Sequence, residues 1–100
     1  MKAATRARIR ELAELATITI ELGELSEVSD EGCTHWVSYS ASLPAGVVEQ
    51  PFMKNEALCE ATLQAKRVAH RLISDGSLGD FVVWRRDGQD VGWLVARRSR

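Results

Sequence analysis

Two cysteines and two histidines are the side chains best suited to metal binding or nucleophilic catalysis: Cys33, His35, Cys59 and His70. Zinc sites normally combine close-spaced pairs of such ligands. Here Cys33 and His35 are two residues apart, but Cys59 and His70 are eleven residues apart, which is about three turns of a helix. The spacing favours structural or surface roles, and we expect neither a metal nor another cofactor.

Nucleophilic catalysis requires more than a cysteine near a histidine, because a third group must orient the base. No glycine-rich turn that could form an oxyanion hole accompanies Cys33, and the chain has no phosphate-binding or dinucleotide-binding glycine pattern. Ser38, Ser40 and Ser42 alternate along a predicted strand, which is typical of a solvent face. We therefore expect no catalytic residue. A small enzyme or metal protein that uses these thiols and imidazoles remains the third alternative.

The carboxylates show a stronger pattern, because they are segregated from the basic residues. No Lys or Arg occurs between Arg10 and Lys54, and this interval contains eight acids. The net charge is +4 over residues 1–10, −8 over residues 11–53 and +3 over residues 54–100, which together give −1. A solvated helix face normally carries both positive and negative charges, since Glu–Lys pairs four residues apart stabilise a helix. A surface of one sign attracts a partner of the opposite charge.

We predict that the acids of residues 11–31 bind a protein partner with a basic surface, such as a nucleoprotein complex. These candidates are Glu11, Glu14, Glu21, Glu24, Glu27, Asp30 and Glu31. Acid–base catalysis by paired carboxylates would require burial, whereas these residues lie on the polar side of a predicted helix or in a polar loop. The alternative is that they form a solvated face without a partner.

Basic residues in the second half of the chain form an alternative, nucleic-acid-binding site. They are Lys66, Arg67, Arg71, Arg85 and Arg86. Such clusters can bind the phosphates of a nucleic acid. Its bases could stack on the three tryptophans, Trp36, Trp84 and Trp93. Because the net charge of the whole chain is −1, we rank direct nucleic-acid binding below protein binding.

The length of 100 residues predicts a single domain, 1–100, with a modest core and little room for a deep substrate pocket. No apolar segment follows the basic N-terminus, so we expect no secretory signal. No run of about 18 apolar residues suggests a membrane span. Two cysteines without motif spacing suit reduced thiols in the cytoplasm, with a single disulfide as the alternative.

The elements that position the acids begin with a predicted helix from Ala3 to about residue 22. The apolar side of its helical wheel holds Ile9, Leu12, Ala13, Leu15, Ala16, Ile20 and Leu22. The acidic side holds Glu11, Glu14, Glu21 and Glu24, with Ile18 as an apolar misfit. The β-branched run of residues 17–20 favours a strand instead. The alternative is therefore a helix to Ala16 followed by a strand, in which Glu21 and Glu24 leave the acidic face.

Three further elements follow a polar loop at residues 24–32. Residues 34–43 alternate as a half-buried strand, with Val37, Tyr39, Ala41 and Leu43 on its inner face. A second helix is predicted from an N-cap at Asn55 to a C′ residue at Gly76. Its apolar face holds Leu58, Ala61, Ala65, Val68, Ala69, Leu72 and Ile73.

The chain ends in a predicted hairpin about Asp87-Gly88, a dipeptide typical of two-residue turns. This turn would place Arg85 opposite Asp90, Trp84 opposite Val91 and Val82 opposite Trp93. The expected order is α-β-α-β-β, an α+β domain with an antiparallel sheet and helices packed on one face. Both hairpin faces would be apolar, so the oligomeric state stays open.

The chain resembles the small proteins that phages use against bacterial defences, particularly anti-CRISPR proteins. The resemblance rests on a compact α/β domain of 100 residues, the lack of a catalytic motif and the segregated acids between Glu11 and Glu31. That class has no shared motif, so no residue role is transferred. The resemblance implies stoichiometric inhibition by binding the basic, nucleic-acid-handling surface of a CRISPR surveillance complex.

Overall fold

The chain forms two helices and a four-stranded antiparallel sheet, in the order α-β-β-α-β-β. The computed structural model describes residues 2–47, 49–75 and 78–97. The helices are α1 (Ala3–Glu14) and α2 (Pro51–Asp75), and the strands are β1 (Thr17–Glu24), β2 (His35–Ser42), β3 (Leu78–Arg86) and β4 (Gln89–Arg97). The predicted α+β class with an antiparallel sheet is confirmed.

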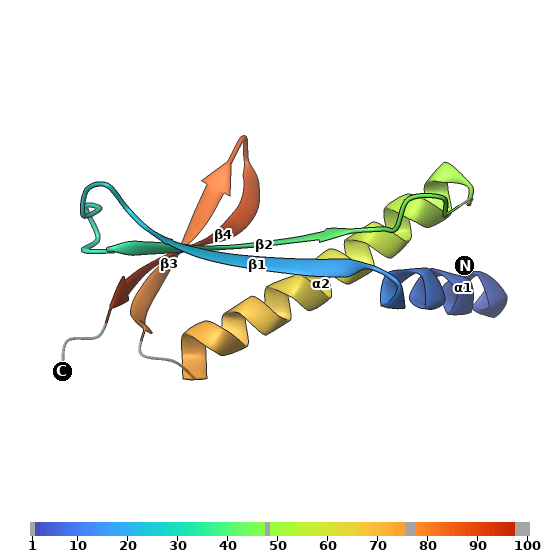
Figure 1. Ribbon diagram of the computed structural model, residues 1–100, viewed down its shortest axis with the longest axis horizontal. Helices are drawn as coiled ribbons and strands as arrows, with labels where there is room; N and C mark the ends of the chain where they lie inside the picture. The colour runs from blue at the N-terminus through green and yellow to red at the C-terminus, as the bar shows by residue number, and fades with distance from the viewer. Residues whose placement is uncertain (1, 48, 76–77, 98–100) are drawn as a thin grey trace.

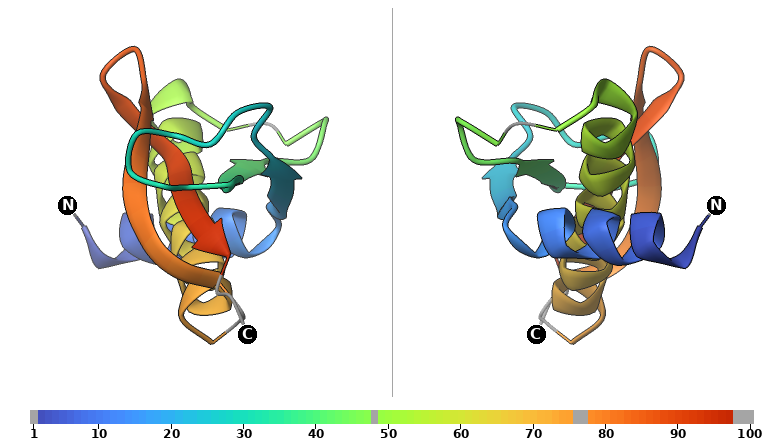
Figure 2. Two further views of the ribbon diagram at one scale, coloured as in Figure 1. Left: turned by 90° about the vertical axis from the view of Figure 1, so that its left-hand side faces the viewer. Right: turned by 90° about the vertical axis from the view of Figure 1, so that its right-hand side faces the viewer.

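The strands lie in the order β1-β2-β4-β3, and α2 runs along one face of the sheet (Figures 1 and 2). In Figure 1 the β3–β4 hairpin crosses the β1–β2 pair on the left, while α1 lies beside the start of α2 on the right. The body is elongated, with principal extents of 50 × 27 × 24 Å. A functional surface can therefore occupy one end without reaching the other.

Two apolar clusters hold these elements together, one at each end of α2. Where α2 covers the sheet, the buried residues are Val37, Ala69, Ile73, Trp93 and Val95. Where α1 meets α2, they are Ile9, Leu12 and Ala57. Alanines recur every four residues along the buried side of α2, at positions 57, 61, 65 and 69. Because alanine has the smallest side chain that still favours a helix, this stripe lets α2 lie close to the sheet.

The preferred prediction of a helix through residue 22 is wrong, and the alternative with a strand is the one that the structure contains. α1 ends at Glu14, and the next two N–H groups bond three residues back, from Leu15 to Leu12 and from Ala16 to Ala13. β1 then pairs with β2 along its whole length, which places Ile20 opposite Tyr39. The β-branched run prefers this pleated surface, where its side chains pack across strands.

The second helix is confirmed, but its start and its buried face differ from the prediction. α2 begins at Pro51, because proline suits the first turn of a helix, and the first backbone bond runs from Lys54 N–H to Gln50 O at 3.1 Å. Asn55 is therefore inside the helix and not its N-cap. Leu58, Val68 and Leu72, predicted to be buried, are 37%, 39% and 57% exposed. The predicted C′ residue, Gly76, lies outside the described residues.

The hairpin turn is confirmed, whereas most of its predicted register is wrong. Asp87 and Gly88 both have positive φ, 52° and 78°, as a type I′ turn requires. Arg85 faces Asp90 as expected, but a register shift next to Trp84 places that residue opposite Gly92, and Val82 faces Leu94. A slip of one residue moves side chains to the other face of a strand. His70 of α2 contacts the rings of Phe81 and Trp93, so Phe81 and Val83 lie on the face covered by α2, and Val82 and Trp84 lie on the opposite face.

Candidate functional site

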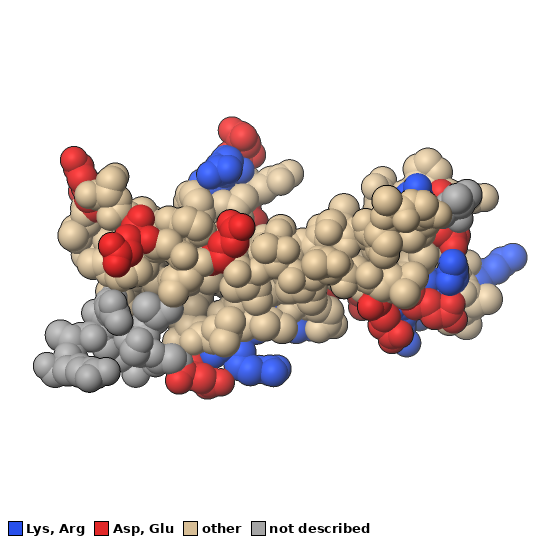
Figure 3. Space-filling view, viewed as in Figure 1, with Lys and Arg blue, Asp and Glu red and all other residues tan. Residues whose placement is uncertain are grey.

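The seven predicted acidic residues do not share one helical face. Glu11 and Glu14 belong to α1, Glu21 and Glu24 to β1, and the other three to the loop that follows β1. Figure 3 shows acidic side chains at the right end and scattered over the left half of the elongated body, with an uncharged stretch between the two groups. The cause is the strand at residues 17–24, which carries the chain away from α1. The predicted single acidic face is therefore wrong.

The acids on α1 are partly neutralised by a neighbouring arginine. Arg8 donates from Nε to Glu49 at 2.7 Å and from a terminal nitrogen to Glu11 at 3.1 Å. The hydrogen bond that Arg8 donates to Glu49, followed by the one that it donates to Glu11, raises the pKa of the Arg8 guanidinium above its ordinary value. Glu11 thus pairs within the chain, which reduces its capacity to attract a partner.

The other acids belong to β1 and to the loop that follows it, a region that we call the acidic end: Glu21, Glu24, Glu27, Asp30 and Glu31. Because side chains alternate along a strand, Glu21 and Glu24 lie on opposite faces of the sheet. All five are exposed, and Glu24 lies 3.6 Å from His35 Nε2. Among the residues that the structure describes, the remaining four form no ion pair. The acidic end therefore presents carboxylates of one sign to solvent.

Backbone hydrogen bonds give the loop of residues 25–34 a defined shape. Leu25 donates to Thr34 O, and Thr34 donates to Val95 O on β4, both at 2.9 Å. Ser29 donates to Cys33 O at 2.9 Å, while its hydroxyl accepts from Cys33 N–H at 3.0 Å. The Cys33 side chain is only 2% exposed and anchors the loop. The carboxylates are thus held on an ordered support.

Val28 is the residue of the acidic end that sequence reasoning missed. Its side chain is 65% exposed, the highest value among the large apolar residues that the structure describes. It lies between Glu27 and Asp30 in the chain. Its signal in the sequence was weak, since one apolar residue in a polar loop is common. An apolar side chain among acids can enter a pocket while the charges around it contact basic groups.

The four potential metal or catalytic residues do not assemble. Both cysteines are free thiols, Cys33 buried and Cys59 exposed. His35 Nδ1 lies 2.7 Å from the Thr34 hydroxyl, whereas the His70 ring packs edge-on against Phe81 and Trp93. Within residues 2–47, 49–75 and 78–97, no group of three His, Cys, Asp or Glu side chains could hold a metal ion.

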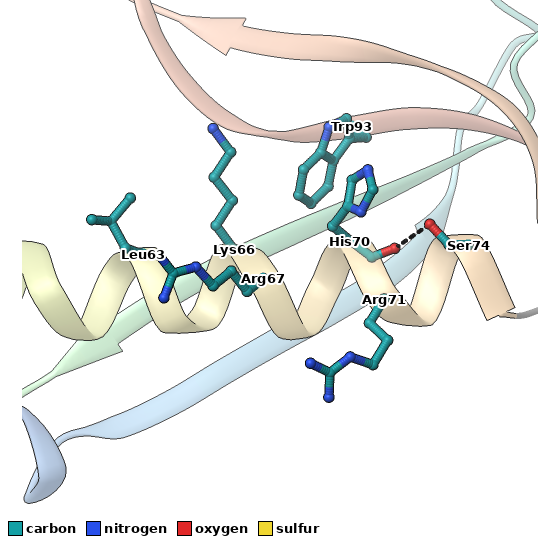
Figure 4. A pocket seen from close by; sticks show the side chains of 7 residues that line it. All are labelled: Leu63, Lys66, Arg67, His70, Arg71, Ser74 and Trp93. Carbon is teal, nitrogen blue, oxygen red and sulfur yellow. Dashed lines mark hydrogen bonds between the residues drawn. The ribbon is translucent and has the colours of Figure 1, made fainter.

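Part of the alternative basic site does assemble, in a surface groove of about 590 Å³ between α2 and β4. Its lining residues are Leu63, Lys66, Arg67, His70, Arg71, Ser74 and Trp93. In Figure 4 the Lys66 and His70 side chains point toward β4, while Arg71 points away from it. Lys66 also lies 3.9 Å from Asp90. The groove is therefore basic but open, and one of its cations is partly neutralised.

The two arginines of the hairpin do not line this groove, but Arg85 shares the Asp90 carboxylate with Lys66 of the groove. Arg85 donates from Nε to Asp90 at 2.9 Å, which offsets its charge. Arg86 lies over the ring of Trp84, 5.3 Å from the centroid, which is a cation–π geometry. Trp84 in turn packs against Trp36, with ring centroids 6.0 Å apart. The five predicted basic residues thus divide between the groove and the hairpin.

Tyr39 on β2 forms a hydrogen bond with β4, and its phenol makes the stability of the fold depend on pH. Its hydroxyl donates to Asp90 O at 3.3 Å, and burial, with a further effect of the Asp90 charge, raises its pKa above 10.0. The raised pKa favours the neutral phenol in the folded state. Its contribution to stability is complete below pH 10.0 and is lost as the pH rises through the folded-state pKa.

Tyr39 is the only tyrosine, so an absorbance titration of phenolate reports on it alone. We expect its midpoint to lie above 10.0 in the folded protein and to fall toward that value in concentrated urea. Asp90→Asn should lower the folded midpoint. A folded midpoint at or below the urea value would contradict the burial of this phenol.

Comparisons with protein-family models, curated proteins and solved structures find no match to this chain. Among the described residues, neither helix is long and apolar enough to cross a membrane. The candidate surfaces therefore rest on geometry and charge alone.

Proposed function

We propose that this is a non-enzymatic binding protein that docks its acidic end on a basic, nucleic-acid-handling surface of another protein. The observation that carries the proposal is the set of five exposed carboxylates at one end, four of which form no ion pair with any described residue. Occupying such a surface would block nucleic acid from it, so inhibition is the concrete form of this function. A CRISPR surveillance complex is one partner of this kind, and two free thiols suit a cytoplasmic location.

Electrostatic steering and a preorganised loop would both favour binding by the acidic end. Carboxylates of one sign raise the rate of encounter with a basic partner. Because hydrogen bonds from Leu25, Thr34 and Cys33 already order the loop, binding loses little additional conformational entropy. Val28 would supply an apolar contact at the centre.

Charge reversal at the acidic end should abolish capture of the partner. We expect Glu27→Lys with Glu31→Lys to weaken binding by about 100-fold, because two favourable contacts become repulsive. The matched control is Glu11→Lys with Glu14→Lys, which changes the net charge equally at the opposite end. Pull-downs from lysate with the wild type and both variants, followed by mass spectrometry, identify proteins that only the first variant loses. An unchanged captured set for that variant would reject the proposal.

The groove beside α2 supports a second candidate function, because Lys66, Arg67 and Arg71 line one concave surface. Such a surface could bind the phosphates of a nucleic acid directly. A mobility-shift titration of the isolated protein separates the two functions. The first proposal expects no shift at low salt, whereas a shift that weakens steeply with salt would favour the second.

A further inference from the structure

The outer edge of β1 is open, because β1 is the first strand of the sheet and pairs only with β2 among the described residues. All eight of its residues pair with β2 without a register shift. The opposite edge of β1 is therefore regular as well. An edge of this kind offers a row of unpaired backbone N–H and C=O groups to another chain.

The other edge strand, β3, is protected in ways that β1 is not. β3 contains two register shifts and carries Asp80, Arg85 and Arg86. Bulges and charges of this kind discourage pairing with another strand. β1 also carries two charges, Glu21 and Glu24, but it contains no proline and no register shift, and its residues 17–20 are uncharged. The contrast indicates that β1 is an edge that pairs.

Apolar side chains line the open edge on the side of the sheet that α2 covers. On β1, Ile18 is 40% exposed and Leu22 is 60% exposed. On the neighbouring side of α2, Val68 is 39% exposed and Leu72 is 57% exposed. Ile18 and Val68 line the same groove, whose lining also includes the charged residues Arg10, Glu14 and Glu60. A strand added to β1 would cover these side chains as well as satisfy the backbone.

The chain exposes more surface than a compact monomer of its mass, by an amount that leaves room for an interface with a second copy. The chain exposes 7186 Å², whereas a compact monomer of 11.1 kDa exposes roughly 5,700 Å². The difference exceeds the approximately 800 Å² that each partner buries in an interface of standard size. The radius of gyration is 16.2 Å, against about 13 Å for a compact chain of this length.

We propose that two copies of this chain pair through β1, antiparallel and about a twofold axis at Ile20, into one continuous eight-stranded sheet. This axis is perpendicular to the sheet, so both α2 helices lie on the same face. Ile20 faces Ile20 of the second copy, and Ile18 faces Leu22 of the second copy. Four strands from each copy make up the sheet. The dimer does not depend on the acidic end binding a partner.

The order of side chains on β1 selects this register over its neighbours. The apolar residues Ile18, Ile20 and Leu22 are symmetric about Ile20, so all three meet apolar residues of the second copy. Thr19 then faces Glu21 of the second copy. A twofold axis at Glu21 would place two carboxylates opposite each other, which is unfavourable. An axis at Thr19 would leave Leu22 beyond the start of the opposing strand, at Ala16.

Light scattering tests the oligomer. At about 100 µM we expect a mass of about 22 kDa, twice the 11.1 kDa of one chain. Leu22→Lys should raise the dissociation constant of the dimer by about 100-fold or more, because it places a charge in the apolar interface. Circular dichroism checks that this variant folds. The matched control is Phe52→Lys, at an apolar residue of α2 that is 55% exposed and lies outside β1, which should remain dimeric. A wild-type mass of 11.1 kDa, or a dimer unaffected by Leu22→Lys, would overturn the proposal.

Disulfide cross-linking tests the register without destabilising the interface by charge. In a Cys59→Ser background, which removes the exposed native thiol, single cysteines replace Thr19, Ile20 or Glu21 in turn. Residues directly opposite in an antiparallel pair are close enough for a disulfide. We expect the Ile20→Cys variant alone to form a covalent dimer rapidly under mild oxidation. A covalent dimer from Glu21→Cys or Thr19→Cys instead, or from none of the three, would overturn the proposed register.

Discussion

Replacing Gly92 with alanine is expected to lower the free energy of unfolding by about 3 kcal/mol, as a methyl group is forced into a closely packed position. Gly92 lies where β4 crosses β2, opposite Ser38 on one side and Trp84 on the other. An added Cβ would collide with the carbonyl group of Val37 and would lie 3.0 Å from the Ser38 Cα. Backbone atoms cannot turn aside as a side chain can, so the two strands would have to separate.

Gly23→Ala is the matched control for this steric argument. Its added Cβ would meet the ring of Trp36 and no backbone atom among its nearest contacts. Because the ring can shift, we expect a smaller loss of about 1 kcal/mol. Urea unfolding followed by tryptophan fluorescence measures both variants, at one protein concentration so that any oligomer is matched. A loss below about 0.5 kcal/mol for Gly92→Ala would mean that β2 and β4 do not approach so closely.

Elements with a single dominant local signal were predictable from the sequence. The alternation of residues 34–43 placed Val37 inside and Ser40 outside, as the structure has them. The Asp87-Gly88 turn was predictable because few residues other than Asn, Asp and Gly adopt its positive φ angles. In such places local backbone preference and burial point to the same structure.

The first strand was difficult to predict because two periodicities compete over residues 11–22. Apolar residues there satisfy a helical wheel, and only Ile18 and the β-branched run indicate a strand. Pairing with β2 decides the outcome, and the partners of residues 17–20 are residues 39–42. A partner so far along the chain is not visible in a local pattern. The hairpin register was wrong for a related reason, since the sequence pattern beside the turn gives no sign of the shift next to Trp84.

Because residues 17–24 form a strand and not part of a helix, the acids of the candidate site lie in other places than predicted. A helix advances about 1.5 Å per residue and a strand about 3.3 Å, so a strand spreads the same acids over twice the length. Glu11 and Glu14 therefore stay at one end, whereas Glu21 and Glu24 move toward the loop of residues 25–34 (Figures 1 and 3). The segregation of charge was predictable from composition, but the surface that it forms was not.

Replacing a buried alanine of α2 by a larger residue is expected to destabilise the protein strongly, because the added side chain would overpack the core. Ala69 is fully buried, at 0% exposure, in the cluster that contains Val37, Trp93 and Val95. Ala69→Leu adds three carbon atoms at this contact, and α2 would have to move away from the sheet. We expect a loss of about 3 kcal/mol in the free energy of unfolding, since a well-packed core cannot accommodate the added volume.

Arg67→Leu provides the comparison on the same helix, because Arg67 is exposed and leucine favours a helix as much as arginine does. We expect this variant to unfold within about 0.5 kcal/mol of the wild type. Both variants are measured by urea unfolding, with circular dichroism to follow the helices and tryptophan fluorescence to follow the sheet. If Ala69→Leu were as stable as Arg67→Leu, space would exist between α2 and the sheet. The close approach that the alanines permit would then not determine where α2 lies, and the edge of β1 beside Val68 and Leu72 would lose its defined shape.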